Sequence, residues 1–203
     1  MTPKETLQRI LEQHNQPSNT PDDVLFNMIF PYCIYKDLAK GSPYSDDGVN
    51  KTYVTRCMDI SSEIYRSLNF GSKLLVVYEA CYSKNEKEEI QFVESCLNGV
   101  KKKEAYSFSW KSPHMDETYP AALACNREVY NCTRILYEAE NIDVQRLFLE
   151  IILSDIGGKY ELASKIFIID TTTGCIFHLF DDRGLWVSGL EGMYFPQLGE
   201  GLL

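Results

Sequence analysis

The sequence lacks both a long apolar run and an apolar leader. Its densest apolar stretch, Leu147 to Leu153, is interrupted by Glu150, whereas a membrane-spanning helix needs about 18 to 20 consecutive apolar residues. Charged residues such as Lys4 and Arg9 occupy the N-terminal region where a secretory signal needs apolar ones. We therefore expect a cytoplasmic protein that has no contact with membranes.

Basic residues are also scarce. The 203 residues include 20 Lys and Arg against 29 Asp and Glu, a net charge of −9. From Glu138 onward there are eleven acidic and four basic residues, a balance of −7. Such a chain repels phosphate backbones, so we expect no nucleic-acid partner and favour a basic protein partner. A purely solubilising role for this acidity is the alternative.

Several motifs of catalysis and cofactor binding are absent. The sequence contains no G-x-S-x-G elbow, no Walker loop and no G-x-G-x-x-G fingerprint, so we expect no cofactor and favour a non-enzymatic protein. No C-x-x-C pair occurs among the seven cysteines, and most of them lie in apolar stretches, where a reduced thiol acts as a small hydrophobe. They are Cys33, Cys57, Cys81, Cys96, Cys125, Cys132 and Cys175.

Length and composition indicate one domain spanning residues 1–203. With 44% hydrophobic residues, a chain of this size buries roughly 70% of its unfolded surface. The start Thr2-Pro3-Lys4-Glu5 has the pattern of a capping box with proline in the first turn. Residues 1–23 are therefore expected to form an N-terminal helix followed by a linker from residue 15.

Hydrophobic periodicity predicts further helices and strands. Apolar residues three and four apart predict a helix over 52–69, and helices over 86–97 and 141–155. β-branched or alternating residues predict strands over 74–78, 106–110 and 129–137. Residues 24–35 are ambiguous between strand and helix.

The segment 166–188 predicts three consecutive antiparallel strands. Two apolar runs flank the turn Thr171 to Gly174, where the glycine supplies positive φ. A second turn precedes the run Leu185-Trp186-Val187. We expect an α+β fold with a mainly antiparallel sheet, a C-terminal β-meander near its centre, and helices packed on one face.

The second turn reads Phe180-Asp181-Asp182-Arg183-Gly184. In this motif the chain resembles the bacterial family known as domain of unknown function 3885, whose signature is Tyr-Asp-Asp-Arg-Gly after an apolar strand that contains a histidine. The resemblance extends to the strands at 166–170 and 176–179 and to the helix that begins near Tyr53. It implies an α+β fold and a bacterial source, and it implies no activity.

The motif has two explanations. In the first it is structural: aspartate accepts a backbone amide, Gly184 adopts the left-handed conformation, and Arg183 pairs with a carboxylate. In the second, His178, Asp181 and Asp182 bind a divalent metal. A further ligand would then come from one of three residues, Asp155, Asp170 or His114.

Two functional hypotheses follow. The favoured one is a non-enzymatic protein-binding module of the immunity or regulatory type, which meets a basic protein through an acidic C-terminal surface. The alternative is a small metal-dependent hydrolase centred on the turn Asp181-Asp182-Arg183. The residues expected to bind the protein partner are Asp181, Asp182, Arg183, Trp186 and Glu191, with Tyr194 and Glu200 nearby.

Overall fold

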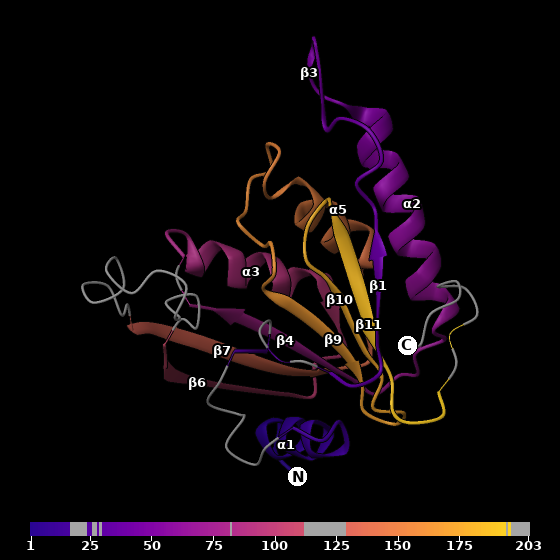
Figure 1. The fold of residues 1–203 in the computed structure, drawn as a ribbon. Helices are drawn as coiled ribbons and strands as arrows, with labels where there is room; N and C mark the ends of the chain where they lie inside the picture. The colour runs from indigo at the N-terminus through magenta and orange to yellow at the C-terminus, as the bar shows by residue number, and fades with distance from the viewer. Residues whose placement is uncertain are drawn as a thin grey trace, which may run out of the picture.

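A computed structural model of the chain describes residues 1–16, 24, 25, 28, 30–81, 83–111, 129–193 and 195. In these ranges seven strands form one antiparallel sheet in the order β1-β11-β10-β9-β4-β7-β6 (Figure 1). The strands are β1 (Cys33–Asp37), β4 (Leu74–Ala80), β6 (Lys102–Lys111), β7 (Val129–Ala139), β9 (Ile166–Asp170), β10 (Ile176–Leu179) and β11 (Gly184–Ser188). Two small ladders pair β2 (Tyr44–Ser45) with β3 (Gly48–Val49) and β5 (Leu97–Asn98) with β8 (Asn141–Ile142).

Helices cover both faces of this sheet. Three of them, α2 (Lys51–Ser67), α3 (Glu86–Cys96) and α5 (Val144–Leu153), lie on one face, and α1 (Pro3–Gln13) lies on the other (Figure 1). The α+β class and the antiparallel sheet are thus confirmed. The expectation that the helices pack on one face is correct for three of the four described helices. It is wrong for α1, which packs on the opposite face.

The reason lies in the central strands, which are apolar on both sides. In β4, Leu74, Val76 and Tyr78 pack with α2, α3 and α5, whereas Leu75 and Val77 pack with α1. Successive strand residues point to opposite faces, so two apolar faces need two covering layers. Helix α1 supplies the second layer with Leu7, Ile10 and Leu11.

Local signals fix the helix ends as expected. The Thr2 hydroxyl accepts from the Glu5 amide at 3.2 Å, and the Glu5 carboxylate accepts from the Thr2 amide at 2.7 Å, which completes the capping box. After α2 the chain turns at Asn69, whose φ is 50°. Of the ambiguous segment 24–35, residues from Cys33 onward form β1, and part of the rest lies outside the described ranges. No described helix is long and apolar enough to span a membrane.

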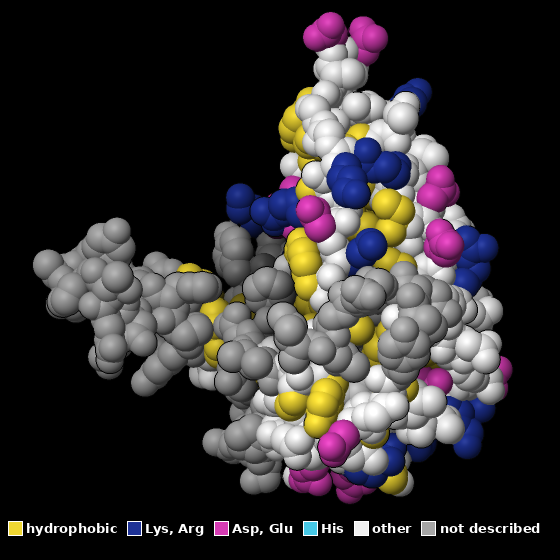
Figure 2. Space-filling view, turned by 45° about the vertical axis from the view of Figure 1, so that its right-hand side comes forward, with side chains coloured by type: hydrophobic (Ala, Val, Ile, Leu, Met, Phe, Trp, Pro, Cys, Tyr) yellow, Lys and Arg dark blue, Asp and Glu magenta, His cyan; other side chains and the backbone are white. Residues whose placement is uncertain are grey.

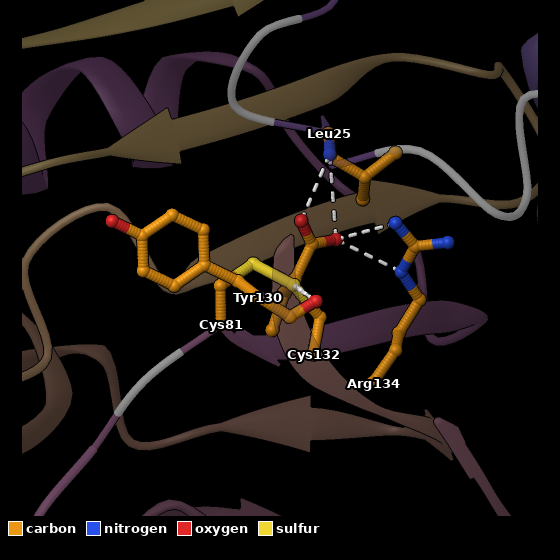
Figure 3. Close-up of a disulfide and its surroundings, with 6 residues drawn as sticks. Leu25, Cys81, Tyr130, Cys132 and Arg134 are labelled. Carbon is orange, nitrogen blue, oxygen red and sulfur yellow. Dashed lines mark hydrogen bonds and ion pairs between the residues drawn. A yellow bond between two sulfur atoms is a disulfide. The ribbon is translucent and has the colours of Figure 1, made fainter. Parts of the chain in front are cut away.

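Four of the described cysteines are free thiols, three of them buried, as expected for most of the seven; two others are oxidised. Cys81 and Cys132 form a disulfide that joins the end of β4 to β7 (Figure 3). The register explains the pairing, because Ala80 lies opposite Thr133 and the next pair in this ladder is Cys81 and Cys132. The sequence around each cysteine does not indicate this disulfide, since 51 residues separate the two cysteines.

Two buried ion pairs lie within the packed layers. Arg134 of β7 is opposite Glu79 of β4, and its guanidinium donates to the Glu79 carboxylate at 2.6 and 2.8 Å; this carboxylate also accepts from the Leu25 amide (Figure 3). In α3, the carboxylate of the buried residue Glu89 accepts from the Lys165 ammonium at 2.8 Å and from the Tyr78 hydroxyl at 2.7 Å. Buried charges need such partners because each one has lost its hydration.

The position of the meander can be tested by amide hydrogen exchange. We expect the amides of β4 and β9 to exchange slowest and those of residues 41–49 fastest, because β9 is the fourth of the seven strands and is buried throughout. Exchange measured by mass spectrometry at neutral pH checks this. Equal exchange rates in β9 and in residues 41–49 would contradict the central placement.

Candidate functional site

The Asp-Asp-Arg-Gly turn joins β10 to β11, and β11 is the strand next to the edge strand β1. Its ends are fixed by backbone hydrogen bonds: the Phe180 amide donates to the Gly184 carbonyl at 3.2 Å, and the Ser164 amide donates to the Phe180 carbonyl at 2.7 Å. The turn is therefore anchored to the segment before β9 as well as to its own hairpin.

Asp181 is directed inward and is occupied by its own turn. Its side chain is fully buried, and one carboxylate oxygen accepts from the Arg183 amide at 2.7 Å. The other oxygen accepts from Nε of Arg183 at 2.7 Å and also contacts the terminal guanidinium nitrogen. The structural explanation of this aspartate, as an acceptor within the turn, is the one the geometry supports.

Asp182 is also buried, on the face covered by α2. Its carboxylate accepts from the Tyr53 hydroxyl at 2.7 Å, and the same hydroxyl lies 3.2 Å from the Asp182 carbonyl oxygen. Burial, followed by the hydrogen bond to Asp182, raises the pKa of Tyr53 above its usual value. The sequence indicated Tyr53 only as the start of a helix and gave no sign that it contacts the turn, since 129 positions separate it from Asp182.

Gly184 is required for a reason other than the expected one. Its φ is not in the left-handed region, so that expectation is wrong. A Cβ at this position would instead lie 2.6 Å from the Tyr35 hydroxyl and 2.9 Å from the Phe180 ring. The glycine allows two aromatic side chains to close over the turn, where their rings stack with centroids 5.9 Å apart. At the preceding hairpin, Gly174 does have the expected positive φ, 76°.

The three residues of the metal hypothesis do not form one ligand set. His178 is fully buried and stacks on Phe167, on the α1 side, with ring centroids 4.0 Å apart. Asp182 faces α2, and Asp181 is engaged by Arg183. In the described ranges no group of three or more His, Cys, Asp or Glu side chains is placed to hold a metal ion. His114 lies outside those ranges.

His178 has a defined tautomer. Its Nδ1 lies 2.7 Å from the Ile166 carbonyl oxygen, and because a carbonyl only accepts, Nδ1 carries the proton. Burial lowers the pKa of His178 to about 4, against smaller opposing effects of the Ile166 hydrogen bond and Asp181. The side chain is thus a neutral part of the core at neutral pH.

The remaining candidate binding residues are not gathered at the turn. Trp186 is partly buried in an aromatic cluster, with ring centroids 5.2 Å from Phe30 and 5.1 Å from His178. Glu191 is exposed but follows β11, whereas the turn precedes it, so the whole strand separates them. Tyr194 and Glu200 lie outside the described ranges.

The expectation that Asp181 and Asp182 belong to an exposed acidic surface is therefore wrong. Asp181 and Asp182 are 0% and 4% exposed, and Asp170 is 3% exposed. Each is held by hydrogen bonds from neighbouring backbone or side-chain groups. Counting charges along the sequence could not reveal this, because the count does not say which carboxylates point inward.

Four basic residues lie at or near Leu38 beside the turn; Arg56 contacts Leu38 with its side chain, and Lys40 and Arg183 contact it through backbone atoms. The Leu38 carbonyl accepts from the Arg56 guanidinium at 3.3 Å and from the Lys40 amide at 2.8 Å, and the Leu38 amide donates to the Arg183 carbonyl at 2.8 Å. Lys36 lies two residues earlier in β1. Figure 2 shows Lys and Arg side chains on the face that carries β1 and α2, with hydrophobic side chains and some Asp and Glu side chains among them. We call Lys36, Lys40, Arg56 and Arg183 the basic cluster.

Arg183 links this cluster to an exposed carboxylate. Its guanidinium lies 3.5 Å from the Asp155 carboxylate, and both side chains are at least half exposed. Burial, followed by the charge of Asp181, raises the pKa of Asp155. An exposed pair of this kind contributes little to stability, and the Arg183 guanidinium thus lies between two carboxylates, those of Asp181 and Asp155.

These observations define an α+β protein whose seven-stranded antiparallel sheet has helices on both faces and an internally bonded Asp-Asp-Arg-Gly turn. Residues 14–191 match the family described as "Domain of unknown function (DUF3885)", and the chain belongs to that family. The family resemblance inferred from the sequence is thereby confirmed. No curated protein and no solved structure matches the chain.

The Tyr53–Asp182 hydrogen bond should be measurable as stability. Tyr53→Phe removes the donor from a buried carboxylate, which typically costs about 1–3 kcal/mol, or about 2–4 °C of melting temperature per kcal/mol in a domain of this size. Asp182→Ala should also lower the melting temperature, and the double variant should be less destabilised than the sum of the two. Tyr65→Phe is the matched control, since the Tyr65 hydroxyl has no hydrogen bond in the described ranges.

The same melting experiment tests the metal hypothesis. Added Mg²⁺, Mn²⁺ or Zn²⁺ should leave the wild-type melting temperature unchanged, because both aspartates are already engaged. A saturable rise of several degrees that disappears in Asp182→Ala would overturn the structural role of the turn.

His178 should make the protein less stable in mild acid. Its pKa of about 4 in the folded state lies below the ordinary value of 6.5, so the unfolded chain binds more protons between these values. The stabilisation from the neutral ring is present above pH 6.5 and is lost as the pH falls towards 4, at up to about 1.4 kcal/mol per pH unit. Urea unfolding from pH 7.5 to 4.5 measures this slope.

The control for this pH series is His178→Asn, whose side-chain amide can still donate to the Ile166 carbonyl. We expect its stability to fall less steeply with acid, with a remaining slope from His14, whose pKa burial also lowers. Identical slopes for wild type and variant would contradict the assignment.

Proposed function

We propose that this chain is a non-enzymatic protein-binding domain, and that the outer edge of β1 receives an extended acidic segment of its partner. The observation that carries the proposal is the combination of an edge strand, an exposed aromatic ring and the basic cluster at one place. Each of these is a known element of peptide recognition.

The backbone of β1 supports this role. At the two ends of β1, the Tyr32 carbonyl accepts from the Gly189 amide and the Leu38 amide donates to the Arg183 carbonyl, just outside β11. Bonded positions alternate in an antiparallel ladder. The amides of Cys33, Tyr35 and Asp37 therefore point away from β11. No strand of the described ranges pairs with that edge, so these groups can add a strand from another protein.

The side chains around the edge favour an acidic partner segment. Tyr35 is 56% exposed and rests on Phe180, and tyrosine and arginine are the residues most often responsible for interface affinity. Lys40 and Arg183 are exposed next to the end of β1, where one acid, Asp37, is exposed as well. The positive charge of these two side chains would complement carboxylates of the partner segment that follow the part bound along β1.

The two hypotheses drawn from the sequence have less support. A basic partner stays a prediction, but the carboxylates expected to attract it at the turn are buried. Scattered exposed acids such as Glu161 and Glu191 are what the C-terminal third retains. No specific observation favours the metal-dependent hydrolase, so we do not propose it.

Site-specific photocrosslinking tests the interface. A photoreactive phenylalanine analogue replaces Tyr35 in the full chain, and the matched control places it at Leu149, an exposed hydrophobic residue on α5. We expect a defined protein adduct in host cells from position 35 and none from position 149, with the crosslinked peptide acidic in composition. Equal labelling at both positions, no adduct at position 35, or adducts with a second copy of this chain would overturn the proposal.

A synthetic peptide of the crosslinked segment then tests the edge itself. Tyr35→Ala should weaken its binding about tenfold, as expected for an aromatic anchor. Tyr35→Pro should weaken it further, because proline also removes the outward N–H, and an edge strand tolerates proline at such a position. Equal affinities of the Ala and Pro variants, with equal melting temperatures, would exclude strand addition.

A further inference from the structure

A second charged feature lies at the other end of the central strands. A pocket of about 500 Å³ opens where α1 meets the ends of β4, β7 and β9. Ligand sites of roughly 300–1,000 Å³ are typical of small molecules. Its polar lining comes from α1 (Thr6 and Arg9), from the start of β4 (Ser72 and Lys73) and from the turn after β9 (Thr171 and Thr172).

The lining is positively charged although the chain is acidic. It contains Arg9, Lys73 and Lys101 against one acid, Glu138. Glu138 is already paired with Lys102 at 3.2 Å, and Lys101 forms an exposed pair with Glu140 at 2.9 Å. Arg9 and Lys73 form no ion pair with any described residue, so no described carboxylate neutralises these two cations.

Arg9 is held in place without a carboxylate. One terminal nitrogen of its guanidinium donates to the Thr171 carbonyl at 3.2 Å, and its buried Nε has no hydrogen-bond acceptor in the described ranges. The Thr171 amide and hydroxyl both donate to the Lys73 carbonyl, at 3.0 and 2.9 Å. These bonds fix the backbone around Arg9, Lys73 and Thr171 before any ligand arrives, which lowers the cost of ordering the site on binding.

From this geometry we infer that the pocket binds a small organic phosphate monoester. Two cations that no described carboxylate pairs with match a dianion, and the guanidinium, ammonium and hydroxyl groups of Arg9, Lys73 and Thr172 are donors suited to phosphate oxygens. The volume exceeds that of phosphate alone, and Leu74 and Ala139 line part of the rest. The organic part of the ligand would contact these apolar residues.

This inference is independent of the proposed partner interface. β10 and β11 separate β9 from β1 in the sheet, so the pocket and the outer edge of β1 involve different residues. Failure of one proposal therefore leaves the other untouched.

Amide chemical-shift mapping of the isotopically labelled full chain tests the pocket at low salt. The probes are inorganic phosphate and adenosine 5′-monophosphate, with adenosine and succinate as the neutral and dicarboxylate comparisons. We expect saturable shifts with both phosphates, centred on residues 6–9, 72–74 and 171–172, and weaker binding as salt is raised. No saturable shift with either phosphate, shifts elsewhere, or equal affinity for adenosine or succinate would overturn the assignment.

Charge reversal separates the pocket from the overall charge. Lys73→Glu should weaken phosphate binding about tenfold or more, the range for loss of a charge-assisted hydrogen bond. Lys87→Glu makes the same charge change at an exposed position of α3, outside the pocket, and should leave the affinity nearly unchanged. Lys73 is itself exposed, so its variant should fold. Equal affinities of the two variants would contradict the site.

Discussion

Burial of the central strands on both faces is the constraint on which the other features depend. Since β4, β9 and β10 are apolar on both sides, the sheet is stable only with α1 on one face and α2, α3 and α5 on the other. Any charge that these layers enclose must find an internal partner. Glu79 with Arg134 and Glu89 with Lys165 meet that requirement.

The same constraint turns the Asp-Asp-Arg-Gly motif inward. Because the turn lies between two buried strands, its carboxylates are desolvated and must be hydrogen-bonded, and Arg183 and Tyr53 provide those bonds. Arg183 and Lys40 are left exposed to solvent, and Lys36 and Arg56 are partly exposed. The two aspartates of the motif thus add no exposed negative charge, and the exposed charges beside the turn are of both signs, Arg183 with Asp155 and Lys40 with Asp37.

The local arrangement of charged side chains therefore says more about possible ligands of this protein than its net charge does. The net charge of −9 predicts poor binding of extended phosphate backbones. A single small phosphate needs only local complementarity, which Arg9 and Lys73 supply in a pocket. An extended acidic peptide likewise needs only the basic cluster beside β1.

The sequence by itself determined the elements and the fold class: the capping box of α1, the stripe of α2, the helices at 86–97 and 141–155, and the meander at 166–188 all follow from local spacing and turn chemistry. Tertiary structure alone decided that Tyr53 meets Asp182, that Cys81 pairs with Cys132, and that Gly184 serves a close approach. These pairings depend on strand register and on which face a side chain takes. Residues far apart in sequence carry no local signal of either, because many registers are compatible with the same apolar pattern.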